Sequence, residues 1–476
     1  MLSRADLLVV LAYYALLTIL AVYGLHRFHL VRLLRRHDSG SSEMPSDPPR
    51  WPDLTIQLPV FNEPRVVERL LESAASLRYP GRVDIQLLDD STDDTSAIAA
   101  RKVGELRARG VAITHVQRCD RKGYKAGALA AGLRLSTSEL FAIFDADFLP
   151  APDTLTRLVP FFAPDVGMVQ ARWDHLNRTD SPLTRVQAIY LDGHFAVESS
   201  ARHLSGRFFN FNGTAGIWRR EAIEDAGGWS ASTVTEDLDL SYRAQLAGWR
   251  FVFVPSVVVP AELPDSLDGF RQQQHRWVKG SMQCARKLLP EIFRSGLPLR
   301  TRIEAFFHLT NNAAYLLTAL LALAIVPSII VRDRLELMWT LAFDLVLFGL
   351  STVSVLVFYL EGQKRVGRKP RLHDFLFVLP LGIGMSLRNS AAVLEGLFKS
   401  GGVFRRTPKR GEELSFPPGE AVPRLPFPEM LLAIFFLTSL LVLAMNGKVA
   451  SVPFLLLFSG GYGFVSLRGL SERFTH

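Results

Sequence analysis

Only two cysteines, Cys119 and Cys284, occur among the 476 residues of the sequence. They lie far apart in segments with the character of cytosolic sequence, which excludes a disulfide framework and argues against thiolate ligands for a metal. A bound metal ion would therefore need oxygen ligands. No zinc-finger spacing, aromatic RNA-binding signature or internal repeat accompanies the net charge of +8, so we expect no nucleic-acid partner.

The sequence also has too little charge for one soluble domain. Hydrophobic residues make up 48% of it and charged residues 21%, which is too apolar for a soluble protein and too charged for membrane helices alone. At about 150 residues per domain, the length allows two or three units. We therefore expect a soluble body joined to membrane helices, with the excess positive charge in loops that face anionic lipid.

The segment Leu7–Leu25 is almost unbroken apolar sequence. It is long enough to cross a hydrocarbon core of about 30 Å as a helix. A signal peptide is the alternative, but no small-residue cleavage site follows. Four arginines follow instead: Arg27, Arg32, Arg35 and Arg36. Positive charge stays in the cytoplasm, so we expect the N-terminus outside and the chain after Arg27 inside.

A Ser/Pro-rich linker, Asp38–Pro52, precedes a region in which strand-like runs alternate with amphipathic helical stretches. This alternation predicts a mostly parallel sheet flanked by helices. The expected strands are Leu54–Val60, Val83–Leu88, Val111–Val116 and Leu140–Phe144. In such sheets the ligand binds outside the carboxyl ends of the strands.

Membrane-type composition returns at about Ile303. The expected spans are Leu309–Val331, Leu337–Leu360, Met430–Met445 and Val449–Val465. A further apolar segment, Phe375–Phe398, contains proline, glycine and charged residues and has basic clusters on both sides. Because the positive-inside rule places both of its ends in the cytoplasm, we interpret it as interfacial or re-entrant.

Two pairs of aspartates follow expected strands. Asp145 and Asp147 stand at alternate positions, so their side chains point the same way and can share a divalent ion such as Mg²⁺ or Mn²⁺. A solvated turn or a helix cap is the alternative for this pair. Asp89 and Asp90 directly follow the run Val83–Leu88, and an aspartate there can bind a nucleotide base or ribose. Both pairs should line one crevice.

Two helix starts carry charged side chains. Lys125 follows the flexible Gly123 and offers a cation to an anionic diphosphate, although a surface lysine is a common alternative. Asp237, in the run Thr235–Asp237, opens the helical stretch Leu238–Ala247, where the helix dipole favours an ionised carboxylate. That position suits a general base, and it also suits a plain helix cap.

The strongest local signal is the run Gln273–Trp277, on an expected amphipathic helix before the membrane region. Arg276 can hold a phosphate through paired hydrogen bonds, and the indole of Trp277 can stack on a sugar. An interfacial helix that uses Trp and Arg as membrane anchors is the alternative.

The order of these motifs resembles the membrane-embedded family 2 glycosyltransferases, the cellulose synthase superfamily. The runs most similar to its mannan and glucomannan synthase-like branch, with its bacterial relatives, are Gln57–Glu63, Leu88–Asp93, Phe211–Gly216 and Gln273–Trp277. The resemblance covers most of the chain. It implies an α/β nucleotide-sugar-binding domain of the GT-A type, inserted between transmembrane helices.

The resemblance also implies roles for the residues that match its motifs. Asp237 would be the base and Arg276 would stabilise the leaving diphosphate. Asp145 and Asp147 would hold Mg²⁺ or Mn²⁺. The donor would be bound by Asp89, Asp90, Lys125 and Gln273, and the acceptor by Asn212, Gly213 and Trp277. A gating loop would include Phe404, Thr407 and Lys409, although Arg406 replaces the usual valine. We recognise no C-terminal cyclic-dinucleotide domain and expect no regulation of that type.

These features predict seven consecutive parts. They are an N-terminal transmembrane helix at 1–30, a linker at 31–52, a cytosolic GT-A domain at 53–260, interfacial helices at 261–302, a transmembrane pair at 303–360, a cytoplasmic interfacial segment with the gating loop at 361–425, and a C-terminal transmembrane pair at 426–476. We expect a multi-pass membrane protein of the plasma or inner membrane with its catalytic domain in the cytosol.

The implied activity is inverting, processive β-glycosyl transfer from a nucleotide sugar to a growing β-1,4-mannan-like or glucan-like chain. GDP-mannose is the favoured donor and UDP-glucose the next. Polar groups inside membrane segments often mark transport paths, so Asn311 and Asn312 are candidates to line an export channel, with helix packing as the alternative. A non-processive enzyme that adds one sugar to a membrane lipid, and a non-enzymatic exporter or scaffold, are the competing interpretations.

Overall fold

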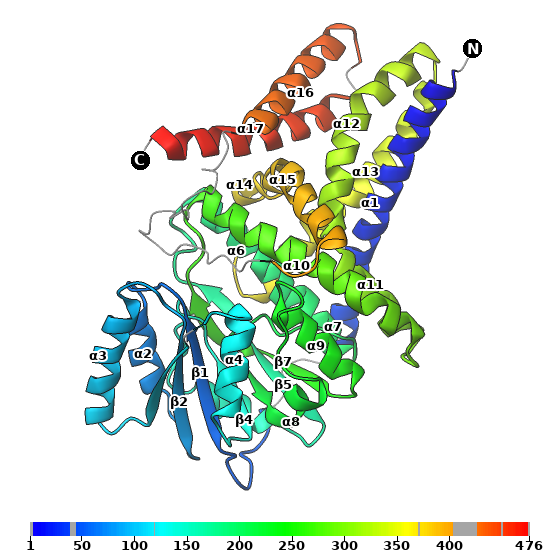
Figure 1. The fold of residues 1–476 in the computed structure, drawn as a ribbon. Coiled ribbons are helices and arrows are strands. Elements are labelled where there is room, and N and C mark those ends of the chain that lie inside the picture. Colours follow the sequence, from blue (N-terminus) through cyan, green and yellow to red (C-terminus); the bar gives the residue numbers. More distant parts are fainter. Residues whose placement is uncertain are drawn as a thin grey trace.

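The computed structural model describes residues 3–38, 44–118, 120–369, 372–402, 426–448 and 451–474. An α/β body lies at one end of the molecule and long helices at the other (Figure 1). The residues of the expected gating loop, Phe404, Thr407 and Lys409, lie outside the described residues.

One seven-stranded sheet forms the centre of the α/β body, in the order β3-β2-β1-β4-β6-β5-β7. The strands are β1 (Leu54–Val60), β2 (Val83–Asp89), β3 (Ile113–Gln117), β4 (Leu140–Ile143), β5 (Val166–His175), β6 (Gly216–Arg219) and β7 (Arg250–Ala261). Strands β1 to β4 pair in parallel, β6 is antiparallel to both of its neighbours, and β5 pairs in parallel with β7. The expected mostly parallel α/β sheet is confirmed.

Helices cover both faces of this sheet. They are α2 (Val67–Ala75), α3 (Thr95–Ala108), α4 (Tyr124–Arg134), α5 (Thr154–Leu158), η1 (Val159–Phe161), α8 (Arg220–Asp225) and α9 (Glu236–Leu246). One core joins the sheet to α2, α3 and α5 through side chains such as Leu70, Val103 and Leu155. A second core joins the other face to α4, α8 and α9 around the fully buried Trp218. Because strands buried on both faces need apolar residues at consecutive positions, β4 appears in the sequence as a continuous apolar run. Strand β1 also carries two buried polar side chains, Thr55 and Gln57, which form hydrogen bonds with Ser138 and Gln86.

Six helices in the described part of the chain are long and apolar enough to cross a membrane. The elements concerned are α1 (Arg4–His37), α12 (Ala313–Arg334), α13 (Leu341–Arg365), α15 (Val378–Phe398), α16 (Phe427–Met445) and α17 (Val452–Phe474). The first helix runs beside α12 and α13, so the N-terminal span joins a bundle built mainly from the C-terminal third of the sequence (Figure 1). These helices indicate a multi-pass membrane protein.

Between the sheet and the bundle lie α10 (Leu267–Arg294) and α11 (Leu299–Thr310), with the short elements η3 (Met338–Thr340) and α14 (Leu372–Phe375) in the later connections. The expected span Leu309–Val331 starts too early. The chain leaves α11 at Asn311 and begins α12 only at Ala313, since asparagine favours turns over helix interiors. Asn311 and Asn312 therefore lie at a helix junction rather than within a span.

The ambiguous segment Phe375–Phe398 forms mainly the continuous helix α15, which packs against α10, α12 and α17 (Figure 1). A side chain on Gly384 would lie 2.3 Å from the carbonyl oxygen of Gly461 in α17. The glycine thus allows two helix backbones to approach closely. The segment is one of the six candidate spans by length and composition, and its interfacial or re-entrant placement remains a prediction.

Candidate active site

A pocket of about 170 Å³ lies at the carboxyl ends of β1, β2 and β4. It brings together side chains that are far apart in the sequence and that the motifs singled out. Its wall includes Asp90, Lys125, Asp145, Asp147, Asn212, Gly213, Asp237, Gln273, Arg276 and Trp277. The expected crevice therefore exists, and it gathers residues from six separate stretches of the sequence.

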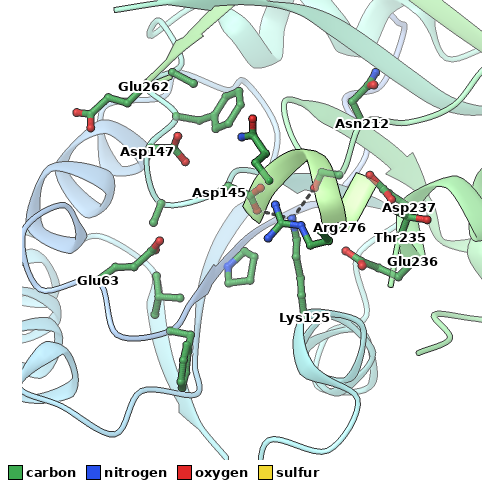
Figure 2. A pocket seen from close by; sticks show the side chains of 18 of the residues that line it. Glu63, Lys125, Asp145, Asp147, Asn212, Thr235, Glu236, Asp237, Glu262 and Arg276 are labelled. Carbon is green, nitrogen blue, oxygen red and sulfur yellow. Dashed lines mark hydrogen bonds and ion pairs between the residues drawn. The ribbon is translucent and has the colours of Figure 1, made fainter. Parts of the chain in front are cut away.

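Six parts of the fold carry these groups, and two of them are the end of β2, which precedes Asp90, and α4, which carries Lys125. Asp145 and Asp147 follow β4, and the loop with Asn212 and Gly213 leads into β6, which pairs with β4. Asp237 stands in the first turn of α9. Helix α10 passes over the pocket and carries Arg276 toward Lys125 and Asp145, with Glu236 and Asp237 on one side and Asp147 on the other (Figure 2).

Lys125 connects the metal-site candidate with the acceptor loop. Its ammonium group forms an ion pair with Asp145 and donates a hydrogen bond to the carbonyl of Gly213 at 2.9 Å. Burial lowers the pKa of Lys125, but the carboxylates of Asp145 and Glu236 outweigh it, so the net shift is upward. Lys125 therefore stays cationic, as binding of a diphosphate requires.

Gly213 has a left-handed backbone with φ of +83°, and a Cβ there would lie 3.0 Å from the Asp237 carboxylate. A glycine is required by both the conformation and the space. This close approach places the acceptor loop directly against the candidate base.

Asp237 has the electrostatic surroundings of a general base. Burial, followed by the negative charge of Glu236, raises the pKa of Asp237 to about 7. The backbone N–H of Leu238 donates to the Asp237 carboxylate at 2.8 Å and fixes one of its oxygens. A carboxylate with a pKa near neutrality takes up a proton far more readily than an ordinary aspartate does.

The value of kcat/KM, which reports on the substrate-free enzyme, should therefore depend on pH near neutrality. A base must be ionised, and because the pKa of Asp237 is raised to about 7, it keeps its proton at lower pH. We expect kcat/KM to fall about tenfold for each pH unit below that pKa and to level off above it. A pH profile of initial rates checks this. An acidic limb at about pH 4, the ordinary range of aspartate, would contradict the assignment.

Asp145 and Asp147 suit a divalent cation that also binds the substrate. Among the residues that the structure describes, no group of three or more His, Cys, Asp or Glu side chains could hold a metal by itself. Two carboxylates leave most positions of an octahedral shell open. Mg²⁺ and Mn²⁺ commonly bind through one or two carboxylates, with phosphate oxygens and water completing the shell. The donor set therefore fits such an ion.

The neighbouring Asp89 and Asp90 have different surroundings. Asp90 lines the pocket and accepts a hydrogen bond from Arg118 at 2.7 Å. Asp89 is 2% exposed and is absent from the pocket wall. Its carboxylate accepts from the Ser91 backbone at 2.9 Å and lies 2.8 Å from His115 Nε2. The position of Asp89 thus favours a structural role in the turn after β2 over direct contact with a donor.

Several groups on the pocket wall were not among the expected site residues. They are Glu63, Arg121, Trp173, His175, Glu236 and Glu262. Glu63 ends the run Gln57–Glu63 and Glu236 belongs to Thr235–Asp237, so both stood within motifs already noted. The guanidinium of Arg121 lies 3.2 Å from the centre of the Phe61 ring, a contact between loops that no sequence spacing indicates.

A second, larger cavity of about 440 Å³ adjoins the pocket. It shares Asn212, Asp237 and Trp277 with the pocket and continues between α1, α12, α13 and α15. Asn311 and Asn312 lie on its wall, as expected for a polar lining. The candidate base therefore stands where the two cavities meet.

Helix α10 approaches the start of α9 at Gly280, where a side chain would lie 2.4 Å from Thr235. We expect Gly280→Ala to displace Thr235 and the adjoining Asp237, costing about 1–3 kcal/mol of stability and much of the activity. Gly104, inside α3, has no atom within 4 Å of its Cβ position, so Gly104→Ala is the matched control. Thermal unfolding and initial rates measure both effects. Equal behaviour of the two variants would contradict the close packing of α10 on α9.

Comparison with known proteins gives concordant results. Residues 52–280 match the sequence model described as Glycosyltransferase like family 2. Glucomannan 4-beta-mannosyltransferase 7 of Arabidopsis thaliana is 34% identical over 439 residues, which cover 87% of this chain and 77% of that protein. Glucomannan 4-beta-mannosyltransferase 1 of Oryza sativa subsp. japonica is 37% identical over 391 residues, covering 78% of this chain and 73% of that protein.

Among solved structures, the mannosyltransferase PcManGT from Pyrobaculum calidifontis, in complex with GDP-Man and Mn²⁺, has a TM-score of 0.54 at 21% identity. The similarity covers 82% of this chain and 99% of that one. At this identity the likeness establishes a shared fold.

Proposed function

This chain belongs to the cellulose synthase-like family 2 glycosyltransferases, and on that basis we propose that it adds mannosyl units from GDP-mannose to a β-1,4-linked mannan or glucomannan chain. The observation that carries the proposal is the single pocket that unites Lys125, Asp145, Asp147, Asp237 and Arg276. The glucomannan mannosyltransferases among its relatives support the sugar, and the GDP-Man complex of the structural neighbour supports the nucleotide. UDP-glucose is the second donor to test.

The two sides of the pocket have different roles in the proposed glycosyl transfer: one binds the donor diphosphate and the other carries the base. On one side, Asp145 and Asp147 would hold Mg²⁺ or Mn²⁺, which neutralises charge on the diphosphate when bound. Lys125 and Arg276 add fixed positive charge at the same place, and such electrostatic stabilisation commonly supplies the largest share of catalysis. On the other side, Asp237 faces the larger cavity, from which the acceptor would enter.

The proposed reaction is a single displacement. Asp237 takes the proton of an acceptor hydroxyl as its oxygen attacks the anomeric carbon from the face opposite the diphosphate. The bond from that carbon to the phosphate oxygen breaks, and the nucleoside diphosphate leaves with the electron pair. Attack from the opposite face converts an α-linked nucleotide sugar into a β-glycoside.

The larger cavity supports a processive enzyme that exports its product. A polysaccharide is too polar to cross lipid unaided, and this cavity extends from Asp237 into the space between the candidate membrane helices. Its lining includes Tyr23, Asn311, Asn312 and Tyr315, which offer hydrogen bonds and rings to a sugar chain. The arginines after Leu25 support a cytosolic position for the catalytic domain.

A panel of nucleotide sugars tests the proposal on the purified protein with a β-1,4-mannooligosaccharide acceptor. We expect GDP-mannose to give a longer product that β-mannanase digests and β-glucanase leaves intact. EDTA should abolish transfer, and added Mn²⁺ or Mg²⁺ should restore it. A small product that partitions into organic solvent would instead identify a lipid glycosyltransferase. Absence of transfer from every donor would support a non-enzymatic exporter or scaffold.

A further inference from the structure

One helical stretch beside the larger cavity contains a π-helical turn. Helix α6 (Pro182–Gly193) continues through η2 (His194–Ser199), whose six residues are π-helical, into α7 (Ser200–Leu204). Such turns often occur at functional sites, where the wider winding changes the direction of side chains. Here His194 and Glu198 both lie on the wall of the cavity that would receive the acceptor.

His194 links this turn to the acceptor loop. Its Nδ1 lies 3.1 Å from a carboxylate oxygen of Glu198, and its Nε2 lies 2.8 Å from the side-chain oxygen of Asn212. Both ring nitrogens thus face acceptor oxygens. The Asn210 amide also donates to this Asn212 oxygen at 3.2 Å, so the orientation of the Asn212 amide is fixed from two sides.

Asn212 adjoins the catalytic centre. Its backbone N–H donates to Gln170 at 3.1 Å. The carbonyl of the next residue, Gly213, accepts a hydrogen bond from Lys125, and a Cβ at Gly213 would lie 3.0 Å from the Asp237 carboxylate. The imidazole of His194 is therefore separated from the candidate base by one short, hydrogen-bonded loop. A displacement at His194 would shift the cavity wall beside Asp237.

The other side of His194 is anchored in the protein interior. Glu198 lies 3.4 Å from Arg202, and Arg202 donates to Glu304 of α11 at 3.0 Å. Glu304 in turn lies 3.0 Å from His26 of α1. Arg202 and Glu304 are each 2% exposed.

Burial raises the pKa of Glu198, but the charge of Arg202 and the hydrogen bond with His194 outweigh it, so its pKa is lowered and it stays ionised. The chain of ion pairs therefore holds this carboxylate and its histidine in one place. A fixed carboxylate, imidazole and amide on one wall form a ready-made set of partners for the hydroxyl groups of a sugar.

We infer that His194, held by Glu198 and bonded to Asn212, is a positioning residue that forms a sugar-binding wall and directs the terminal hydroxyl of the acceptor toward Asp237. This inference rests on the proposed function, since it requires a hexopyranose chain in the larger cavity. Trp173 and Trp277 line the same cavity and supply apolar ring surfaces against which that sugar can stack.

Two reactions of the donor should respond differently to the loss of this wall. Transfer needs a correctly placed acceptor, whereas slow hydrolysis, in which water attacks the anomeric carbon and GDP and free mannose are released, does not. A structural defect in the pocket would lower both reactions together. Loss of the positioning wall should lower transfer much more than hydrolysis and should raise the KM of the acceptor.

The experiment compares both reactions of GDP-mannose in His194→Ala, His194→Gln and Glu198→Gln, using a β-1,4-mannooligosaccharide. Misplacing a reacting group by about 1 Å can cost roughly a hundredfold in rate, so we expect His194→Ala to reduce transfer kcat/KM by about 10–100-fold. Hydrolysis should fall far less. His194→Gln keeps a donor for Asn212 and should recover part of the loss.

His203→Gln is the matched control. His203 lies in α7, packs on Phe209 and is absent from the walls of both cavities. Thermal unfolding of each variant identifies misfolded protein. If Glu198→Gln does not fold, the transfer and hydrolysis rates of His194→Gln test the inference in its place. Suppose that the wild-type enzyme transfers normally. If His194→Ala then lowers transfer and hydrolysis in parallel, or lowers neither, the inference alone is overturned. A wild-type enzyme that transfers no sugar to the oligosaccharide would overturn the proposed function and the inference with it.

Discussion

Replacing Asp237 with asparagine should lower kcat by about 10²–10⁴-fold, the range contributed by a general base. Asparagine has nearly the same shape, so the amide can still accept the Leu238 N–H, but it cannot take the proton of the acceptor hydroxyl. The affinity for GDP-mannose should change little, because Asp237 lies on the acceptor side of the pocket. Initial rates and nucleotide binding, measured on the same preparation, test both statements.

A matched carboxylate away from the pocket provides the control. Asp165, directly before β5, forms an exposed ion pair with Arg250 at the start of β7, so Asp165→Asn should keep full activity. If Asp237→Asn retained most of its activity while remaining folded, another group would have to be the base. Glu236, which adjoins Asp237 and whose pKa burial also raises, would then be the first residue to examine.

Replacing Arg276 with alanine should lower kcat by about 10²–10³-fold, the typical cost of removing one group that stabilises developing charge. Arg276 lies on α10 above Lys125 and Asp145, and a diphosphate held there gains negative charge as it leaves (Figure 2). The KM of GDP-mannose should also rise. Arg276→Lys keeps the charge but loses the planar pair of donors, so it should restore only part of the rate.

Arg286 is the control on the same helix, because it bonds Ser400 and the carbonyl of Leu397 at the surface. We expect Arg286→Ala to leave kcat and the KM of the donor near their wild-type values. Equal losses in the Arg276 and Arg286 variants would indicate that α10 matters only for stability. The interfacial-anchor interpretation of Gln273–Trp277 would then be preferred.

The strands and the acidic site were predictable because their sequence signals are local. Strand β1 occupies the expected range Leu54–Val60. Strand β4 lies within the expected range Leu140–Phe144, since a strand buried on both faces needs a continuous apolar run. The pair Asp145 and Asp147 directly follows such a run, and parallel strands bring their carboxyl ends to one edge. That rule was enough to place Asp90 and Asp147 on one pocket wall.

Features that depend on tertiary contacts were not predictable in the same way. A π-helical turn does not change the apolar pattern of a helix, so nothing in the sequence distinguished His194 from His203, which is also half-buried. The internal role of Asp89 depends on His115, which comes from a different strand. The junction at Asn311 had a local signal in its two asparagines, but the long apolar run that follows them led the expected span to start too early.

The proposed reaction requires Asp145 and Asp147 to bind the diphosphate of a nucleotide sugar through a divalent cation. Calorimetric titration of GDP into the purified protein, first with Mn²⁺ and then with EDTA, measures this binding. We expect tight binding with Mn²⁺ and much weaker binding with EDTA, and we expect Asp147→Asn in Mn²⁺ to bind as weakly as the wild type in EDTA. Equal GDP affinity under all three conditions would contradict the claim.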